Sequence, residues 1–279
     1  MNKSRFSSVA IALLLFSVFA ASDARAVAFR TFIASTGSDA NTATNCGRTT
    51  PCQHLNSAYS VTSPAGEIVA LDSAGVGGVT ITTAVTITSL PGEYSFINVP
   101  AATAGITINA GTNDLVVLRN LQVSGANAAS TTGVQLNTGN LLIENCSFSE
   151  LTTGVFSFRK ADIVDSNFHG NTTAVRADGE GADTQSGIYL ATQTSVRISN
   201  GNYIGNGTAF VIANPGLRTC PSCGGSKANL FVRLLGNSSA DYSVNIAGNT
   251  NAVTGTGVGC PTVNDCTQPT GYSGVTNPR

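Results

Sequence analysis

Apolar and polar residues alternate along the middle of the chain in a pattern that recurs about every twenty residues. Within residues 131–175, three short runs, GVQL, LLIE and CSFS, follow one another with turn residues between them, and the same order then begins again. Each run has the period-two apolarity of a β-strand with one buried face. The pattern therefore predicts a coil of three short strands that is repeated along the chain.

Three columns of equivalent positions appear when the repeats are aligned. The aliphatic column holds Leu118, Ile143, Ile163 and Ile198; the second column holds Asn120, Asn145, Asp165 and Asn200; the third holds Val123, Phe148, Phe168 and Tyr203. One coil cannot bury its own apolar face, so like coils must stack on one another. We expect an all-β parallel β-helix with three strands per coil, because a β-sandwich would lack such aligned columns.

The second column predicts a structural ladder. An inward Asn at the same corner of each coil can bond through its carboxamide to the backbone and to the Asn of the next coil. A carboxylate at Asp165 can accept the same corner hydrogen bonds.

The ends of such a solenoid are open sheet edges that must be covered. PCQHLNSAYS, residues 51–60, predicts a short N-terminal capping helix, with Pro51 at its start and Leu55, Ala58 and Tyr59 on its buried face. The first predicted strand is EIVALD. We expect an N-terminal segment with this helix at 27–62, the β-helix at 63–247 and a C-terminal loop or tail at 248–279.

Residues 1–26 have the features of a signal peptide. Lys3 and Arg5 precede an apolar stretch, and Ala24-Arg25-Ala26 provides a small-x-small cleavage site. The apolar stretch is too short for a transmembrane anchor, which needs roughly 20 apolar residues. The sequence thus predicts export to the periplasm or the cell exterior, with no integral membrane segment after cleavage.

Charge argues against nucleic acid as a partner. The formal net charge is −1, and the loss of three basic side chains and one acidic side chain with residues 1–26 would bring it to about −3. Charged residues make up only 10% of the chain. No basic patch of the kind that binds nucleic acid is visible.

Seven cysteines in an exported chain predict disulfide bonds. Six of them form three pairs by spacing, namely Cys46 with Cys52, Cys220 with Cys223, and Cys260 with Cys266. Cys220 and Cys223 could each pair with the last two cysteines instead. A zinc site from these four is disfavoured, because Cys223 and Cys260 are separated by more than zinc-ribbon spacing. Cys146, within a strand pattern, is expected to be a buried, inert thiol.

The chain resembles a known superfamily over residues 29–246. The run RTFIASTGSDANT, Cys46, Pro51-Cys52, the short helix, SPAGEIVALDSAGVGGVTITTAVTIT and the coils resemble exported bacterial proteins with a right-handed parallel β-helix of the pectin-lyase-like kind. That superfamily contains pectate lyases, pectin lyases, polygalacturonases, phage tailspikes and members without known activity. The resemblance implies the fold and a polysaccharide partner.

Catalytic candidates are sparse. A polygalacturonase-like hydrolase needs converging carboxylates, yet the chain has no adjacent Asp pair, and it lacks the Gly-His-Gly and Arg-x-Lys motifs of that family. A pectate-lyase-like reaction needs Ca²⁺ held by carboxylates and a basic side chain to take a proton. The candidates for it are Arg159, Arg176, Asp178, Glu180 and Asp183. A solvated loop, rich in glycine, is the simpler interpretation of residues 177–187.

The sequence therefore favours a non-catalytic binding or surface-structural module, with polysaccharide as the expected partner class. No cofactor and no metal site are expected. A lyase or hydrolase acting on acidic polysaccharide is the alternative, and only the lyase would require Ca²⁺.

Overall fold

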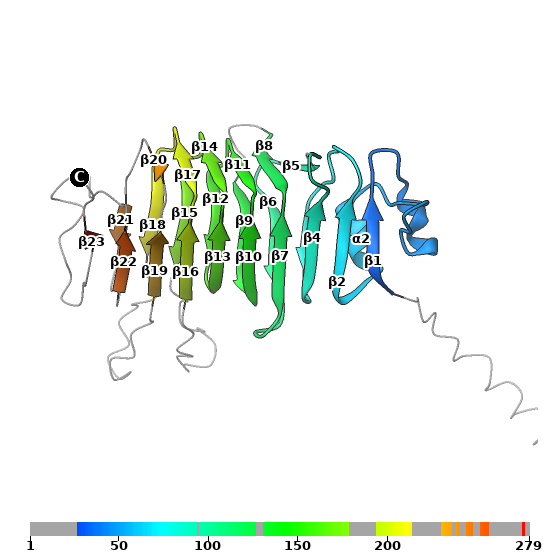
Figure 1. Cartoon of the computed structure of the whole chain (residues 1–279), viewed down its shortest axis with the longest axis horizontal. Helices are drawn as coiled ribbons and strands as arrows, with labels where there is room; N and C mark the ends of the chain where they lie inside the picture. Colours follow the sequence, from blue (N-terminus) through cyan, green and yellow to red (C-terminus); the bar gives the residue numbers. More distant parts are fainter. Residues whose placement is uncertain are drawn as a thin grey trace, which may run out of the picture.

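Three parallel β-sheets form the architecture of the protein (Figure 1). The computed structural model describes the backbone of residues 27–93, 95–126, 131–178 and 194–213, together with the later strands 230–235, 238–239, 244–247, 252–256 and 275–276. Side chains are described for residues 27–208, except those of 94, 127–130 and 178–195. From β3 to β22, successive strands pass to the three sheets in turn, so each sheet takes every third strand. The predicted parallel β-helix with three strands per coil is confirmed.

We name the sheets A, B and C. Sheet A contains β1 (Ala28–Ile33), β2 (Thr62–Ala70), β4 (Val85–Ser89), β7 (Leu115–Arg119), β10 (Asn140–Glu144), β13 (Lys160–Val164), β16 (Thr194–Ser199), β19 (Leu230–Leu235), β22 (Ala252–Thr256) and β23 (Val275–Thr276). Sheet B contains β5 (Ser95–Val99), β8 (Leu121–Gly125), β11 (Ser147–Ser149), β14 (Asn167–His169), β17 (Asn202–Ile204) and β20 (Ser238–Ser239). Sheet C contains β3 (Val79–Ile81), β6 (Ala104–Asn109), β9 (Thr132–Thr138), β12 (Thr153–Ser157), β15 (Thr173–Asp178), β18 (Thr208–Ala213) and β21 (Val244–Ala247).

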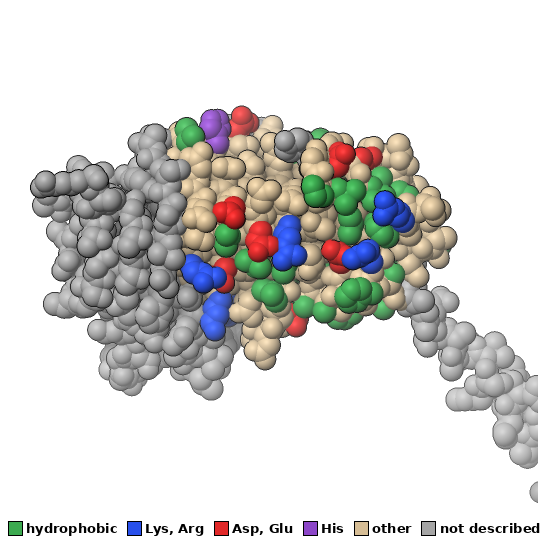
Figure 2. Space-filling model, in the orientation of Figure 1, with side chains coloured by type: hydrophobic (Ala, Val, Ile, Leu, Met, Phe, Trp, Pro, Cys, Tyr) green, Lys and Arg blue, Asp and Glu red, His purple; other side chains and the backbone are tan. Residues whose placement is uncertain are grey.

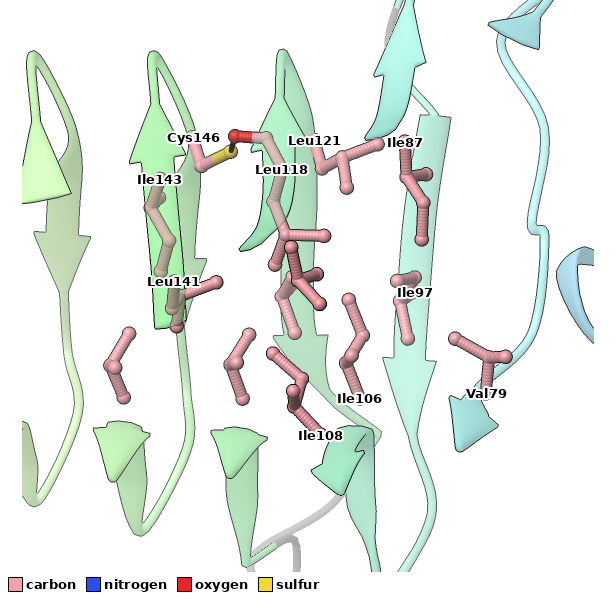
Figure 3. Packing of buried hydrophobic residues seen from close by; sticks show 14 of the residues in the cluster. Val79, Ile87, Ile97, Ile106, Ile108, Leu118, Leu121, Leu141, Ile143 and Cys146 are labelled. Carbon is pink, nitrogen blue, oxygen red and sulfur yellow. Dashed lines mark hydrogen bonds between the residues drawn. The ribbon is translucent and has the colours of Figure 1, made fainter. Parts of the chain in front are cut away.

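The aligned columns of the sequence lie in register in the structure. Ile143 pairs with Leu118 on one side and Ile163 on the other, and Phe148 pairs with Val123 and Phe168. Figure 3 shows Ile87, Leu118 and Ile143 on successive strands of sheet A, pointing into the space between the sheets. All these side chains are buried. Stacking of like residues thus makes one continuous apolar core, as predicted from the repeat.

Aromatic rings continue this core in sheet B. The centroids of Phe148 and Phe168 are 4.9 Å apart, and those of Phe168 and Tyr203 are 5.0 Å apart. The rings are stacked nearly parallel to one another, with interplanar angles of 12° and 4°. The strand spacing of a parallel sheet, about 4.8 Å, imposes this stacking distance.

The second column lies at the sharp corner between sheets A and B. Asn120, Asn145, Asp165 and Asn200 all have positive φ, between 51° and 56°. Asn and Asp adopt this left-handed conformation more readily than most residues. Each of the first three donates its backbone N–H to a carbonyl of the next coil.

The expectation that these four side chains point inward is wrong. Asn120 is half-buried and the other three are exposed, because the left-handed turn directs the side chain away from the core. A side-chain bond joins only the first pair: Asn145 Nδ2 donates to Asn120 Oδ1 at 2.8 Å, and Asn120 Nδ2 donates to the carbonyl of Ser89 at 3.1 Å.

An inward asparagine ladder exists at a different corner, between sheets B and C. The Asn171 carboxamide donates to Phe148 O at 3.0 Å and to Asn206 Oδ1 at 2.9 Å, and its oxygen accepts the N–H of Leu151 at 3.1 Å. Asn206 donates in turn to the carbonyl of Phe168 at 3.0 Å. Asn171 is only 2% exposed. This ladder satisfies backbone groups that the turn would otherwise leave buried and unpaired.

The N-terminal end has a cap and one more strand than expected. The first strand is β1 rather than the EIVALD segment, whose first four residues end β2, and β1 pairs in parallel with β2 at the edge of sheet A. Helix α2 (Leu55–Ser60) contacts β1, β2 and β3 and buries Leu55 and Ala58, as predicted (Figure 1). The helix begins at Leu55, four residues later than expected, because Pro51 lies in a loop whose backbone covers the edge of β1.

Side-chain hydrogen bonds hold this cap in place. Asp39, in the 3-10 helix η1 (Asp39–Thr44), accepts the backbone N–H of Gln53 and of His54, and its other oxygen lies 2.6 Å from His54 Nδ1. Burial raises the pKa of Asp39, but these hydrogen bonds and one from Ser57 outweigh it and lower the pKa overall. On the helix, the Tyr59 hydroxyl accepts the backbone N–H of Thr82 at 2.7 Å and of Thr83 at 3.1 Å.

The predicted disulfide between Cys46 and Cys52 is present. It closes the loop whose backbone pairs with β1. Cys220, Cys223, Cys260 and Cys266 lie outside the described residues. In the described part of the chain, no helix has the length and apolar character needed to cross a membrane.

Replacement of Asn171 tests the inner ladder. We expect Asn171→Ala to lower the free energy of unfolding by about 2–4 kcal/mol, because the Phe148 carbonyl and the Leu151 N–H would remain buried without partners. Asn113→Ala, at an exposed turn position, is the matched control and should change it by less than about 0.5 kcal/mol. Urea unfolding followed by circular dichroism measures both. Equal effects of the two substitutions would contradict the ladder's role.

Candidate binding face on sheet C

The outer face of sheet C carries one row of long side chains. Gln135 of β9, Phe156 of β12 and Arg176 of β15 are neighbours in register. All three are half-buried. Their inward neighbours Val155, Ser157, Val175 and Ala177 are buried in the core. The alternation of the strands therefore presents this row to the outside.

Two aromatic rings and a guanidinium group lie close together on β12, on β15 and at the start of the turn that follows β12. The centroids of Phe156 and Phe158 lie 4.5 Å apart, with the rings tilted by 46°. The guanidinium carbon of Arg176 lies 4.9 Å from the centroid of Phe156. This distance is that of a cation–π contact between the guanidinium and the ring.

Arg159 continues the cluster at the turn from β12 to β13. Its backbone N–H donates to Ser157 Oγ at 3.2 Å, and the Ser157 hydroxyl donates to the Arg159 carbonyl at 2.9 Å. Ser157 is fully buried, so it fixes the turn from inside. We call Phe156, Phe158, Arg159 and Arg176 the basic–aromatic patch. Such a patch can stack against a flat apolar ring face and pair with an anion.

The structure describes the side chains of only two of the five candidate residues of the lyase alternative, Arg159 and Arg176. Arg176 lies beside Phe156, and Arg159 lies two residues beyond Ser157, the register neighbour of Ala177. Asp178 ends strand β15, but its side chain is outside the described set, as are Glu180 and Asp183. Among the described residues, no group of three or more His, Cys, Asp or Glu side chains could hold a metal ion. The Ca²⁺-dependent site therefore stays a prediction.

Phe156 and Phe158 are not among the candidate residues predicted from the sequence. The signal was present in TGVFSFRK, where Val155 and Ser157 occupy inward positions and the two phenylalanines therefore alternate outward. An outward aromatic pair beside two arginines is an uncommon exposed feature in a chain with 6% aromatic residues.

Sheet A presents a different outer face. Its charged side chains pair across neighbouring strands: Arg30 with Glu67 at 2.6 Å, Arg197 with Asp162 at 3.0 Å, and Arg119 with Glu144. Figure 2 shows basic and acidic side chains side by side on the face that it draws, with hydrophobic side chains between them. These three ion pairs neutralise much of the charge on the described part of sheet A, although Lys160 at the start of β13 has no ion pair among the described residues.

Cys146 is a buried thiol, as predicted. It is 2% exposed and forms no disulfide. Its Sγ lies 3.6 Å from the carbonyl oxygen of Leu118, a contact drawn in Figure 3. Burial raises the pKa of this thiol to about 12, so the reactive thiolate is scarce at neutral pH.

No protein-family model, curated protein or solved structure matches this chain.

The Cys146 thiol should be unreactive in the native protein. We expect a thiol-specific aromatic disulfide reagent at about pH 8 to leave Cys146 unmodified in buffer and to modify it fully in concentrated urea. Mass spectrometry of the peptide that contains Cys146 measures the fraction modified. Rapid labelling in buffer would contradict the buried position.

Proposed function

We propose that the protein is an exported, non-catalytic binding module of the pectin-lyase-like kind, and that the basic–aromatic patch on sheet C binds acidic polysaccharide. The observation that carries this proposal is the placement of the Arg176 guanidinium over Phe156, beside Phe158 and close to the turn that bears Arg159. Export is supported by the sequence pattern of residues 1–26.

The two kinds of side chain suit two parts of a uronate ring. The apolar C–H face of a sugar stacks on an aromatic ring, which would use Phe158, while Phe156 would hold the Arg176 guanidinium in place. A uronate carboxylate accepts charge-assisted hydrogen bonds from a guanidinium group, which would use Arg176 and Arg159. Stacking and ion pairing in one patch would favour acidic over neutral polymers.

The repeat of the β-helix suits a polymer that also repeats. The outer row of sheet C continues from Phe156 through Gln135 to Thr107 and Thr80 on earlier coils. These positions follow one another at the strand spacing of about 4.8 Å. A polysaccharide laid across the coils would thus meet polar side chains on the N-terminal side of the patch, whereas the row continues on the other side to Val211.

Retention on immobilised polygalacturonate tests the proposed function. We expect Phe156→Ala and Arg176→Ala each to weaken binding about tenfold, a loss of about 1.4 kcal/mol. Arg197→Ala is the matched control, because it removes the same charge from sheet A, and it should bind like the native protein. Binding should also fall as salt is raised, since the contact is partly ionic.

The same samples separate binding from lyase activity. Each protein is incubated with soluble polygalacturonate, with and without Ca²⁺, and the ultraviolet absorbance of unsaturated products is followed. We expect retention without product. A Ca²⁺-dependent product that disappears in Asp178→Ala would contradict the non-catalytic proposal, and retention unchanged by Phe156→Ala and Arg176→Ala would contradict the patch as the site.

A further inference from the structure

A groove of about 530 Å³ lies along the corner between sheets A and B, away from the basic–aromatic patch. It lies over strands β8, β11 and β14, and the loop 90–93 closes one side. Its volume is within the range of small-ligand sites. We call it the corner groove; its polar lining residues are Glu93, Asn120, Gln122, Asn145, Ser147 and Asn167.

The floor of the corner groove is apolar and fixed. Leu121 and Cys146 line it with only 3% and 2% of their surface exposed. Both belong to the continuous core (Figure 3). Leu90 and Pro91 add an apolar wall from the loop. Because the floor belongs to the stacked coils, it is formed before any ligand arrives.

Polar side chains repeat along the groove at the coil spacing. Gln122, Ser147 and Asn167 are register neighbours on β8, β11 and β14, so they follow one another at about 4.8 Å. Among the described residues, no hydrogen bond engages the side chain of Gln122 or Asn167. The carboxamide nitrogens of Asn120 and Asn145 donate within the protein, which leaves the oxygen of Asn145 as an acceptor.

Charge in the groove selects against anions. Glu93 is the acidic lining residue, and its Oε2 accepts the hydroxyl of Ser73 at 2.8 Å. None of the described residues that line the groove is a Lys or an Arg. The nearby Arg119, just before Asn120, is paired with Glu144. The groove thus lacks the cation that a uronate, a phosphate or a nucleic acid requires.

We propose that the corner groove binds a short segment of neutral glycan. Carboxamide and hydroxyl side chains both donate and accept hydrogen bonds, as sugar hydroxyl and acetamido groups do. Their regular spacing fits a chain that repeats the same groups along its length. This site is independent of the proposed function. Its proposed ligand is a neutral glycan, whereas the proposed ligand of the basic–aromatic patch is an acidic polysaccharide.

A peptide is a poorer occupant of this groove. Peptides often bind by adding a strand to a free sheet edge. Strands β8, β11 and β14 each have a hydrogen-bonded neighbour on both sides within sheet B. These three strands therefore have no open edge to which a peptide strand could pair. Recognition must come from side chains, and these suit hydroxyl groups.

Titration calorimetry with cellohexaose, xylohexaose and chitohexaose tests the proposal. We expect at least one of these neutral oligosaccharides to bind the native protein. The double variant Gln122→Ala with Asn167→Ala should weaken that binding at least tenfold, and Ser147→Phe, which fills the groove, should abolish it. Asn98→Ala is the matched control, because Asn98 lies on the same sheet in the neighbouring outward row, and it should bind like the native protein.

Two further comparisons separate this site from the patch on sheet C. Phe156→Ala and Arg176→Ala should leave neutral oligosaccharide binding unchanged, and the groove variants should leave polygalacturonate retention unchanged. The proposal is overturned if none of the three oligosaccharides binds, or if binding persists in Ser147→Phe. Nuclear magnetic resonance of the native protein should show the side-chain amide signals of Gln122 and Asn167 shifting on addition of the bound oligosaccharide.

Discussion

Parallel hydrogen bonding between each coil and the next is the constraint on which the rest of the structure depends. It sets one register for all three sheets, so a residue on one coil lies beside its equivalent on the next. A one-residue slip in any strand would turn its apolar side chains outward and its polar side chains inward. The stacked Phe148, Phe168 and Tyr203, the inner Asn171 ladder and both proposed binding surfaces all follow from this register.

Close approach of the coils also explains why glycine occupies certain positions of the repeat. A Cβ at Gly133 would lie 2.6 Å from the carbonyl oxygen of Gly154, and a Cβ at Gly154 would lie 2.5 Å from that of Ala174. These distances are too short for any side chain, so the Thr-Gly-Val sequence that starts β9 and β12 is required where sheet B turns into sheet C. The repeat visible in the sequence thus records backbone packing as well as the apolar core.

The sequence was sufficient to predict the coil, because core residues such as Ile143 and Phe148 recur with the period that the register imposes. It was not sufficient to orient the corner residues. Asn145 and Asn171 are both asparagines at corners, but the first takes a left-handed conformation and is exposed, whereas the second is buried. That difference depends on turn geometry. The basic–aromatic patch was missed in part because the contact of Arg176 with Phe156 joins residues of different coils, although the alternation of β12 indicated which side chains face outward.

The register itself can be measured by disulfide cross-linking of outward positions on sheet B. Ser149 and His169 are register neighbours on β11 and β14, whereas Ser149 and Asn202 are separated by one further strand. The structure predicts that Ser149→Cys with His169→Cys forms a disulfide readily, because adjacent parallel strands bring such residues within bonding distance. Ser149→Cys with Asn202→Cys should not form one. A cross-link in the second pair, or none in the first, would contradict the stacked register.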